Sequence, residues 1–141
     1  MSEENVEVVR QLLEDFHAGV TRGDPGAGYD SAPLPDDFEY VMPEGIVNPG
    51  GKRVLHGRAE FVEFFRTWTE EFEDWSQQAE RLIDADDRVV ALTRQSAVGK
   101  ASGARVELQL GQIYEFEEGR LIRVRFYIGY GDTLEAAGVS E

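Results

Sequence analysis

The sequence predicts an α+β fold. A strongly curved antiparallel or mixed sheet wraps around a long helix to make a cone-shaped barrel, and a further helix precedes it at the N-terminus. Three observations lead to this prediction. An amphipathic helical pattern opens the chain, a helix with one aromatic face begins after Gly57, and a run of strand-like segments joined by turn signals follows. We expect one domain over residues 1–141, since the chain has the usual length of a single domain and shows no internal repeat.

Composition limits the classes of function to be considered. The chain carries 28 acidic and 14 basic residues, which give a formal net charge of −14. A surface this acidic repels phosphate backbones and anionic lipid, so we expect neither a nucleic-acid nor a membrane partner. The sequence has no cysteine, which excludes a disulfide framework, a thiolate zinc site and a cysteine nucleophile. The N-terminal residues lack the basic and apolar regions of a signal peptide, and we expect a cytoplasmic protein.

The first helix is expected from about residue 3 to about residue 21. Its apolar residues recur at helical spacing, and they are Val6, Val9, Leu13, Phe16 and Val20. Ser2 is a suitable N-cap, and the two glutamates after it suit the positive end of the helix dipole. Residues 25–37 contain glycines and prolines and predict a loop, with at most one helical turn over residues 27–31.

A short strand and the aromatic helix follow. Residues 38–42 alternate with period two and predict a strand that Pro43 ends, and residues 46–55 predict a hairpin or an irregular loop. The helix is expected from about residue 59 to residue 74. Its aromatic stripe consists of Phe61, Phe64, Phe65, Trp68 and Phe72. Because burial of an aromatic side chain contributes roughly 1.5–3 kcal/mol, this stripe is expected to dominate the core.

Four strand segments are expected after this helix, over residues 78–85, 88–98, 105–117 and 121–130. Asp86-Asp87 and Glu118-Gly119 are turn signals between neighbouring segments. Consecutive segments joined by short turns pair antiparallel, so we expect a sheet with the helices on one face.

Alternation assigns the side chains of the last two strands to faces. The even-numbered positions 106–116 and 122–128 form the apolar face, which must meet the aromatic helix. The opposite face carries Glu107, Gln109, Ile113, Glu115, Arg123, Arg125 and Tyr127. Its glutamates could pair with its arginines across the strands. In the strand over residues 88–98, neither face is clearly the inner one.

Several short motifs, together with the order of the elements, give the chain a family resemblance. They are Arg22-Gly23-Asp24 after the first helix, His56-Gly57-Arg58 before the aromatic helix, Gly119-Arg120-Leu121-Ile122 at the last hairpin and Leu134-Glu135-Ala136-Ala137-Gly138 near the end. On these residues, and over nearly its whole length, the chain resembles the SnoaL-like branch of the nuclear transport factor two-like superfamily. That fold hosts isomerases, hydrolases, cyclases and non-catalytic binders, so the resemblance does not determine an activity.

The resemblance implies a cone-shaped pocket between the helices and the concave sheet face, and a homodimer through the convex face. The implied pocket residues are Tyr40, Met42, Phe65, Trp68, Arg94, Gln112, Tyr114 and Phe126. The implied dimer residues are Glu107, Gln109, Arg123, Arg125 and Tyr127. We expect no cofactor and no metal, because the sequence has no phosphate loop or dinucleotide motif and its two histidines have no metal-binding partner at helical spacing.

The chemistries known for this fold can be compared with these residues. Ketosteroid isomerase needs a carboxylate base, together with a tyrosine and a protonated aspartic acid that hold the oxyanion. Its base position falls on Met42, its aspartate position on Gln112 and its tyrosine position on Leu12 or Leu13. A thioether cannot take a proton from carbon, so this reaction is not expected.

Two other chemistries of the fold also lack residues that they need. The related epoxide hydrolases use an arginine between two aspartates, whereas Arg94 has Ser96 and Gln112 where carboxylates would help. The SnoaL-type cyclases use an aspartate in the cavity, and no inward-facing strand carboxylate matches it.

Three residues remain as catalytic candidates: His56, Arg94 and Tyr40. An inward-facing Arg94 would bind a ligand carboxylate, phosphate or enolate beside Gln112. The alternative is that Arg94 pairs with Glu39 or Glu44, or lies on an exposed face. His56 could serve as a general base, or it could cap or orient the helix entry. His17 is expected to be structural.

The sequence therefore supports three hypotheses of function. The first is a non-catalytic member that binds a small, largely apolar molecule with a polar or anionic group. The second is a cofactor-independent isomerase, cyclase or hydrolase acting on a polyketide- or steroid-like substrate. The third is a protein-interaction module. An acid or base near Arg94 or Gln112 in an open cavity would favour the enzyme, and filling of the cone by Phe65, Trp68 and Phe126 would favour the third hypothesis.

Overall fold

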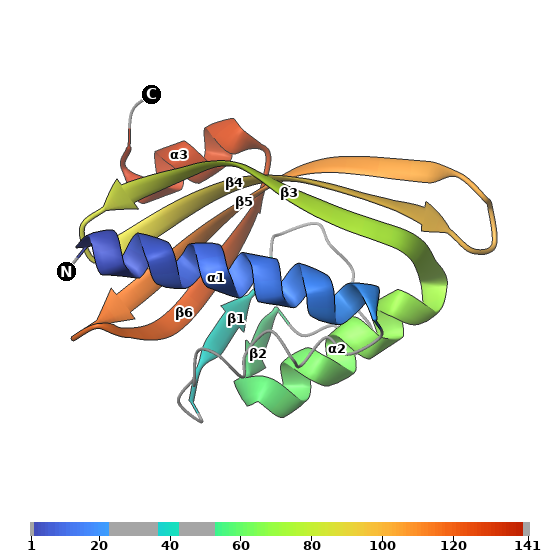
Figure 1. Cartoon of the computed structure of the whole chain (residues 1–141), viewed down its shortest axis with the longest axis horizontal. Coiled ribbons are helices and arrows are strands. Elements are labelled where there is room, and N and C mark those ends of the chain that lie inside the picture. The colour runs from blue at the N-terminus through green and yellow to red at the C-terminus, as the bar shows by residue number, and fades with distance from the viewer. Residues whose placement is uncertain (1, 23–36, 43–52, 140–141) are drawn as a thin grey trace.

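The computed structural model describes residues 2–22, 37–42 and 53–139. Within them, one curved sheet has two helices on its inner face and one on its outer face (Figure 1). The inner helices are α1 (Ser2–Thr21) and α2 (Gly57–Glu71), and the outer one is α3 (Tyr130–Ala137). None of these helices is both long and apolar enough to cross a bilayer.

The sheet has the strand order β2-β1-β6-β5-β4-β3. Its strands are β1 (Glu39–Val41), β2 (Val54–His56), β3 (Phe72–Ala85), β4 (Arg88–Gly99), β5 (Arg105–Glu117) and β6 (Arg120–Ile128). β1 pairs parallel with β6, and every other pair is antiparallel. The predicted mixed, curved α+β sheet is therefore confirmed. The loop expected over residues 25–37 lies outside the described part of the chain except for Asp37, and so do residues 43–52.

The main core lies between the inner face and the two inner helices. α1 buries Val9, Leu12 and Phe16, whose spacing places them on one side of the helix. Phe16 packs edge-on against Phe65 of α2, with ring centroids 4.8 Å apart, and against Trp75 of β3 at 5.7 Å. The aromatic contacts therefore join both helices to the sheet, as the stripe of α2 predicted.

The aromatic helix ends earlier than its pattern predicts. It stops at Glu71, and Phe72 already pairs with Gly99 as the first residue of β3. Asp74 then takes a φ of 53° within a bulge of β3, and Arg105 Nη2 donates a hydrogen bond of 2.6 Å to its carboxylate. Phe72 continues the helical spacing of the stripe, but pairing with β4 overrides that local signal.

The structure also settles the faces of β4, which the sequence left open. Ala91 lies opposite Gln112, and Gln95 lies opposite Leu108, so the odd-numbered residues of β4 share the inner face. The even-numbered residues, Arg94 among them, lie on the outer face. This register removes Arg94 from the cone.

A second, smaller core lies on the outer face under α3. Val90, Leu92 and Ile113 are buried there against Ala137. The sequence predicted strand up to Tyr130, whereas β6 ends at Ile128 and α3 begins two residues later. Ile113 was expected on an open convex face, and it is covered instead because the closing segment folds back over the sheet.

Candidate functional site

The candidate site is built on the inner face, where β1, β6 and β5 lie side by side. Tyr40 lies opposite Val124, Val124 lies opposite Tyr114, and Gln112 lies opposite Phe126. We call Tyr40, Gln112, Tyr114 and Phe126 the inner-face site. The pairing of β1 with β6 and of β6 with β5 brings these four predicted pocket residues together, although they span 87 positions of the sequence.

A hydrogen bond joins the two polar residues at the centre of the site. The Tyr114 hydroxyl donates to the Gln112 carboxamide oxygen at 2.5 Å, and the two residues are 2% and 3% exposed. Burial raises the pKa of Tyr114 well above its ordinary value, and the nearby Tyr40 raises it further. Tyr114 is therefore a neutral hydrogen-bond donor at physiological pH. Within the described residues, the Gln112 amide nitrogen has no hydrogen-bond partner.

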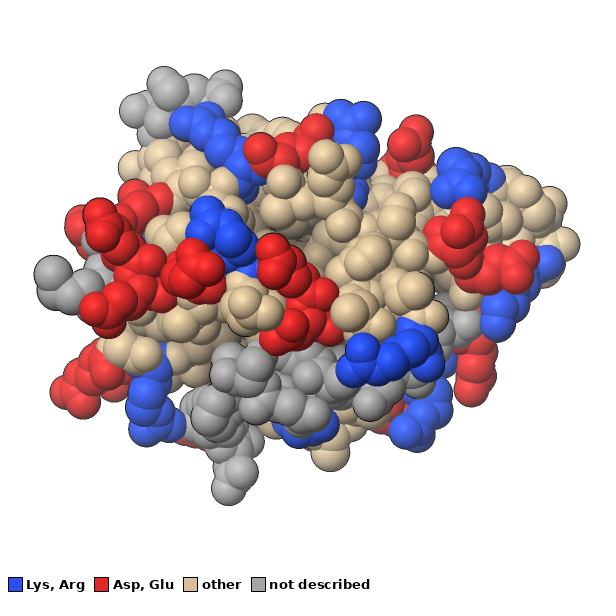
Figure 2. Space-filling model, in the orientation of Figure 1, with Lys and Arg blue, Asp and Glu red and all other residues tan. Residues whose placement is uncertain are grey.

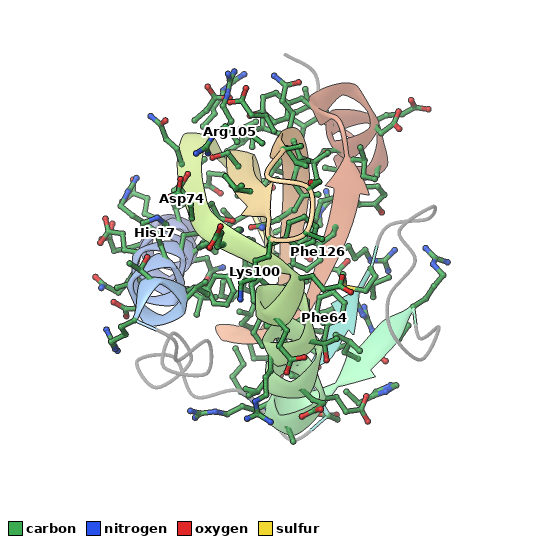
Figure 3. All side chains as sticks on the ribbon, turned by 90° about the vertical axis from the view of Figure 1, so that its right-hand side faces the viewer. His17, Phe64, Asp74, Lys100, Arg105 and Phe126 are labelled. Atoms are coloured by element: carbon green, nitrogen blue, oxygen red, sulfur yellow. The ribbon has the colours of Figure 1, made fainter. Side chains whose placement is uncertain are left out.

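Aromatic rings form the walls beside this pair. Tyr40 stacks on Phe61 of α2 at a centroid distance of 4.2 Å and on Phe126 at 4.9 Å. Figure 3 shows Phe126 on the side of the sheet that α2 covers. Met42 and Phe65 belong to the same core, but the side chain of Trp68 lies outside the described part of the structure.

Apolar side chains extend the inner face beyond the packed core. Leu110 and Ile128 are paired on β5 and β6, and Val106 follows farther along β5 opposite Ala97. Val106 and Ile128 are 50% and 41% exposed, whereas Leu110 is buried. Aromatic rings thus pack against the inner face at Tyr40 and Phe126, whereas Val106 and Ile128 are partly exposed farther along β5 and β6.

A second polar group lies on the inner faces of β3 and β4. Gln95 Nε2 donates a hydrogen bond of 2.7 Å to Gln77 Oε1, and the Thr93 hydroxyl donates to the Leu110 carbonyl at 2.8 Å. Sequence reasoning missed these residues because it did not assign a face to β4. A search for the strand face that continues Gln112 and Leu110 across the sheet would have found them.

Arg94 was predicted in the pocket and the prediction is wrong. Its guanidinium lies on the outer face, where Nη2 is 3.5 Å from the Glu80 carboxylate, and its side chain is 48% exposed. Glu80 also accepts a hydrogen bond from the Tyr130 hydroxyl. Solvent and Glu80 therefore satisfy the charge that a buried arginine would leave unpaired.

His56 lies outside the inner-face site, at the start of α2. Its backbone N–H donates a hydrogen bond of 3.0 Å to Glu60 Oε1, which satisfies one of the free donors at the helix start. Its ring Nε2 is 3.4 Å from Glu39, on the face opposite Tyr40. This is the capping position that the sequence offered as the alternative to catalysis. His17 packs its ring near Trp75, at 5.5 Å.

The ionisable side chains of the described sheet gather on the outer face instead. Arg123 donates hydrogen bonds of 2.7 Å to Glu39 and 2.8 Å to Glu115, and Arg125 Nε lies 3.5 Å from Glu115. The bond from Arg123 lowers the pKa of Glu39, although burial opposes it. Pairing of Glu115 with both arginines confirms the cross-strand pairs predicted from alternation. On the described inner faces of β4, β5 and β6, Tyr114 is the only ionisable side chain.

The arrangement of the inner-face site favours binding over acid–base chemistry. It offers amide and phenol donors and apolar walls, but the inner-facing side chains of β1, β5 and β6 include no carboxylate or imidazole. Among the described residues, no three histidine, aspartate or glutamate side chains come close enough to hold a metal ion.

Comparison with known families now identifies the chain. The SnoaL-like domain model matches residues 13–124, which is most of the sequence. The chain belongs to the SnoaL-like domain family. A search of curated proteins finds no match to this SnoaL-like domain.

Solved structures show that this SnoaL-like chain has the nuclear transport factor two-like fold. An NTF2-like protein of unknown function from Burkholderia pseudomallei is 21% identical, with a TM-score of 0.74 over 93% of this chain and 95% of that one. TerC co-crystallised with polyporic acid is 21% identical, with a TM-score of 0.71 over 95% and 98%. A putative SnoaL-like polyketide cyclase from Jannaschia is 17% identical, with a TM-score of 0.72 over 99% and 94%.

Proposed function

We propose that this SnoaL-like protein binds a small, largely apolar molecule against the inner face of its sheet. The observation that carries the proposal is the exposed apolar surface on that face, the same face as the buried Gln112–Tyr114 pair, where Ile128 lies opposite Leu110 and Val106 lies farther along β5, both partly in solvent. Exposed apolar side chains that continue a core toward solvent are typical of ligand surfaces.

The polar group of the ligand is proposed to be a neutral hydrogen-bond acceptor, such as a ketone or quinone oxygen. Gln112 has two amide N–H groups, while its oxygen is already bonded to Tyr114. An anionic group, which the sequence also allowed, would need a cation, and the one expected there, Arg94, lies on the other face. A buried anion without a cation is strongly unfavourable.

One similar structure supports the binding of a small organic molecule by this fold. TerC, which shares the fold at 21% identity, was crystallised with polyporic acid. That molecule is therefore a rational first probe for this chain.

The second candidate function is a cofactor-independent isomerase, cyclase or hydrolase acting on a polyketide- or steroid-like substrate. The observation that favours it is the Gln112 amide held by the Tyr114 hydroxyl, since its N–H donors can polarise a carbonyl as negative charge develops on the carbonyl oxygen. Tyr40 is the remaining base candidate beside the site, because His56 and Arg94 lie on the outer side. The described inner faces of β4, β5 and β6 carry no carboxylate. For this reason we place catalysis second, after ligand binding.

The test measures a ligand directly. Native mass spectrometry of the freshly purified protein should show an added small-molecule mass, and titration calorimetry should show binding of polyporic acid. Gln112→Leu is expected to weaken that binding about tenfold, the equivalent of about 1.4 kcal/mol. Gln109→Leu is the matched control, because Gln109 is on the outer face of the same strand. Equal affinity in both variants, or no bound molecule in either measurement, would contradict the proposal.

Residence in the cytoplasm is part of the same proposal. A chain without cysteine gains no disulfide from an oxidising compartment, and this supports a location in the cytoplasm. Fractionation of cells that produce the tagged full-length protein tests it, and recovery in a membrane or extracellular fraction would overturn it.

A further inference from the structure

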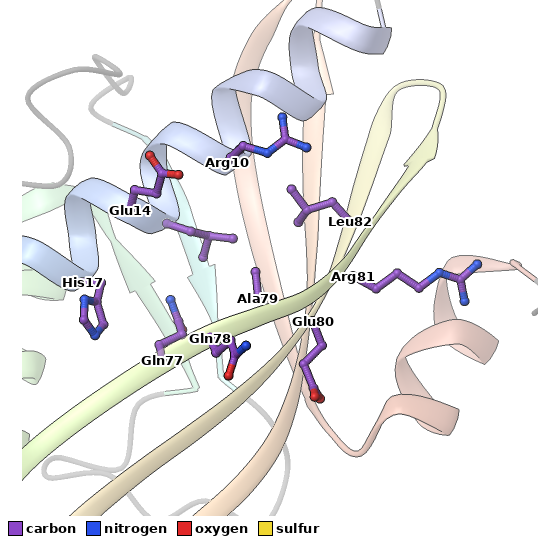
Figure 4. Close-up of a pocket in the computed structure, with 10 residues that line it drawn as sticks. Arg10, Glu14, His17, Gln77, Gln78, Ala79, Glu80, Arg81 and Leu82 are labelled. Atoms are coloured by element: carbon purple, nitrogen blue, oxygen red, sulfur yellow. The ribbon is translucent and has the colours of Figure 1, made fainter.

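A groove separate from the inner-face site lies between α1 and β3 (Figure 4). Its volume is about 630 Å³, which is in the range of small binding sites in proteins. One wall is a single stripe of α1, at residues 10, 13, 14 and 17, and the other is the run of β3 over residues 77–82. We call this hollow the edge groove.

The edge groove follows the free edge of β3. β3 is the last strand of the sheet, and among the described strands it pairs only with β4. Gln77 and Ala79 of the lining are on the inner face of β3, whereas Gln78 is on the outer face. Because successive strand residues point to opposite faces, a hollow lined by both sets runs along the edge of the strand. Arg81 is on the outer side of this edge, and its side chain points away from α1.

This edge presents unused backbone groups to the groove. Residues 76–79 pair in unbroken antiparallel register with residues 93–96 of β4, up to the bulge between Ala79 and Arg81. In such a ladder every second residue directs both its N–H and its C=O away from the partner strand. Within the described residues, no group outside β4 bonds to the backbone of residues 76–79. An open edge of this kind is a template for one more strand.

The stripe of α1 lies beside this edge and gives the groove its side chains. In Figure 4, His17 lies near Gln77 and Arg10 lies near Leu82, so α1 runs antiparallel to β3. Leu13 and Leu82 supply the apolar part of the lining. A strand added to the edge of β3 would lie beside α1 and turn every second side chain toward it.

The charge available in the groove is negative. Glu14 is exposed and makes no ion pair or hydrogen bond within the described part of the chain, so its carboxylate is available to a partner. Arg10 already bonds Glu7 at 2.5 Å. Glu80 lies 3.5 Å from Arg94 Nη2 on the outer face. The net charge of −14 adds a long-range attraction for a cationic partner.

We propose that the edge groove binds an extended basic peptide of a partner protein, which adds as a strand along residues 76–79 of β3. The backbone of the peptide bonds to the free edge, and its lysine or arginine lies beside Glu14. An apolar side chain two positions farther along the peptide contacts Leu13 and Leu82. In strand addition the main-chain bonds provide affinity, and the alternate side chains provide specificity.

The test uses the synthetic peptide acetyl-Thr-Lys-Thr-Val-Thr-amide, which has lysine and valine on one face of a strand. Titration followed by backbone amide NMR should shift the resonances of residues 14–17 and 76–79, and amide exchange should slow at every second residue of 76–79. The same peptide with glutamate in place of lysine should bind more weakly. Shifts that fall elsewhere, no saturation at millimolar peptide, or equal binding of the glutamate peptide would overturn the proposal.

Two methylated peptides test whether the bound peptide is a strand. One carries a methyl group on the amide nitrogen of the central threonine, and the other carries it on the amide nitrogen of the valine that follows. Successive N–H groups of a strand point to opposite sides, so one methyl group should lower the affinity about tenfold and the other should leave it nearly unchanged. Equal affinities of the two methylated peptides would overturn the proposal.

A variant of the protein tests the charged contact. Glu14→Gln should lower the affinity for the lysine peptide about two- to fivefold, as expected for an exposed ion pair. Glu70→Gln is the matched control, because Glu70 is an exposed acid on α2, away from the groove. Unchanged affinity in a folded Glu14→Gln protein would contradict the proposal. Resonances of residues 76–79 that shift with protein concentration alone would show that a second copy occupies the edge, and this too would overturn it. The inner-face site does not enter these experiments, so their result is independent of the proposed function.

Discussion

At the scale of the residue, the Gln112–Tyr114 hydrogen bond is the feature whose loss can be measured most directly. Tyr114→Phe keeps the ring and removes the donor, which leaves the buried Gln112 oxygen without a partner. We expect the free energy of unfolding to fall by about 1–3 kcal/mol, measured by urea denaturation. Tyr127→Phe is the control, since the Tyr127 hydroxyl has no hydrogen bond within the described residues, and its effect should stay within about 0.5 kcal/mol. Equal losses in both variants would show that the bond contributes nothing.

A second residue, Tyr130, makes the free energy of unfolding depend on pH in the alkaline range. Burial, and then its hydrogen bond to Glu80, raise the pKa of Tyr130 to about 12. The unfolded chain loses this proton near pH 10 and the folded protein keeps it, so the free energy of unfolding falls as pH rises between these two values. Tyr114 acts in the same direction, because burial also raises its pKa.

The contribution of Tyr130 is isolated by difference. Urea unfolding of the natural chain and of Tyr130→Phe should be compared at about pH 9 and about pH 11, on either side of the ordinary tyrosine pKa. The variant should lose less stability over this interval than the natural chain. An identical loss in the two proteins would mean that Tyr130 titrates as in an unfolded chain.

At the scale of the element, the docking of α3 depends on one glycine. A Cβ at Gly111 of β5 would lie 1.7 Å from the Thr133 hydroxyl oxygen, so no side chain fits while α3 stays in place. Gly111→Ala should lower the free energy of unfolding by about 1–3 kcal/mol or displace α3. Gly131→Ala is the matched control within α3, because no atom lies within 4 Å of its added Cβ. Alanine there should stabilise the helix by up to about 1 kcal/mol.

The two alanine variants are compared by urea denaturation, and NMR reports whether α3 remains packed on Ile113. The double variant Gly111→Ala with Thr133→Gly should recover part of the loss, since it removes the side chain that the methyl group meets. A Gly111→Ala protein as stable as the natural one would show that α3 does not hold this position.

The elements also show what can be predicted from the sequence and what cannot. α1 and the alternating strands β5 and β6 were predicted closely, because each carries a regular apolar pattern over many residues. The start of β3 was missed because Phe72 and Trp75 continue the helical spacing of α2, and only pairing with β4 makes them strand. α3 was missed because it is short, and its packing partners Val90 and Ile113 lie far away in sequence.

The residues of the candidate site also divide into those that the sequence predicted correctly and those that it did not. Tyr40, Gln112, Tyr114 and Phe126 were predicted together, since the faces of β5 and β6 follow from alternation. The prediction put Arg94 on the wrong face because β4 is apolar on both faces. The inner face of β4 meets the core, and its outer face meets α3. A strand covered on both sides carries no signal of its own for which side is inner.

At the scale of the whole molecule, charge is distributed unevenly over the surface. On the face shown in Figure 2, acidic side chains gather over the N-terminal part of α1, with basic side chains among them. The outer sheet face carries both signs in a paired network of Glu39, Glu115, Arg123 and Arg125. A surface that carries both positive and negative side chains can pack against the same surface of a second copy of the chain across a two-fold axis without net electrostatic repulsion.

This outer face leads to the last prediction, a homodimer. α3 covers its middle, so the surface open to a partner is reduced to the charged network and to the end of β5 that carries Glu107 and Gln109. Light scattering at micromolar concentration should give twice the 15.8 kDa mass of the chain. The double variant Glu107→Arg with Gln109→Arg changes the charge of this surface without breaking a pair of the network, and it should shift the protein toward the monomer. Glu70→Arg on α2 is the control and should leave the dimer intact. A natural chain that scatters as a monomer would end the prediction, and a dimer unaffected by the double variant would place the interface away from this end of the sheet.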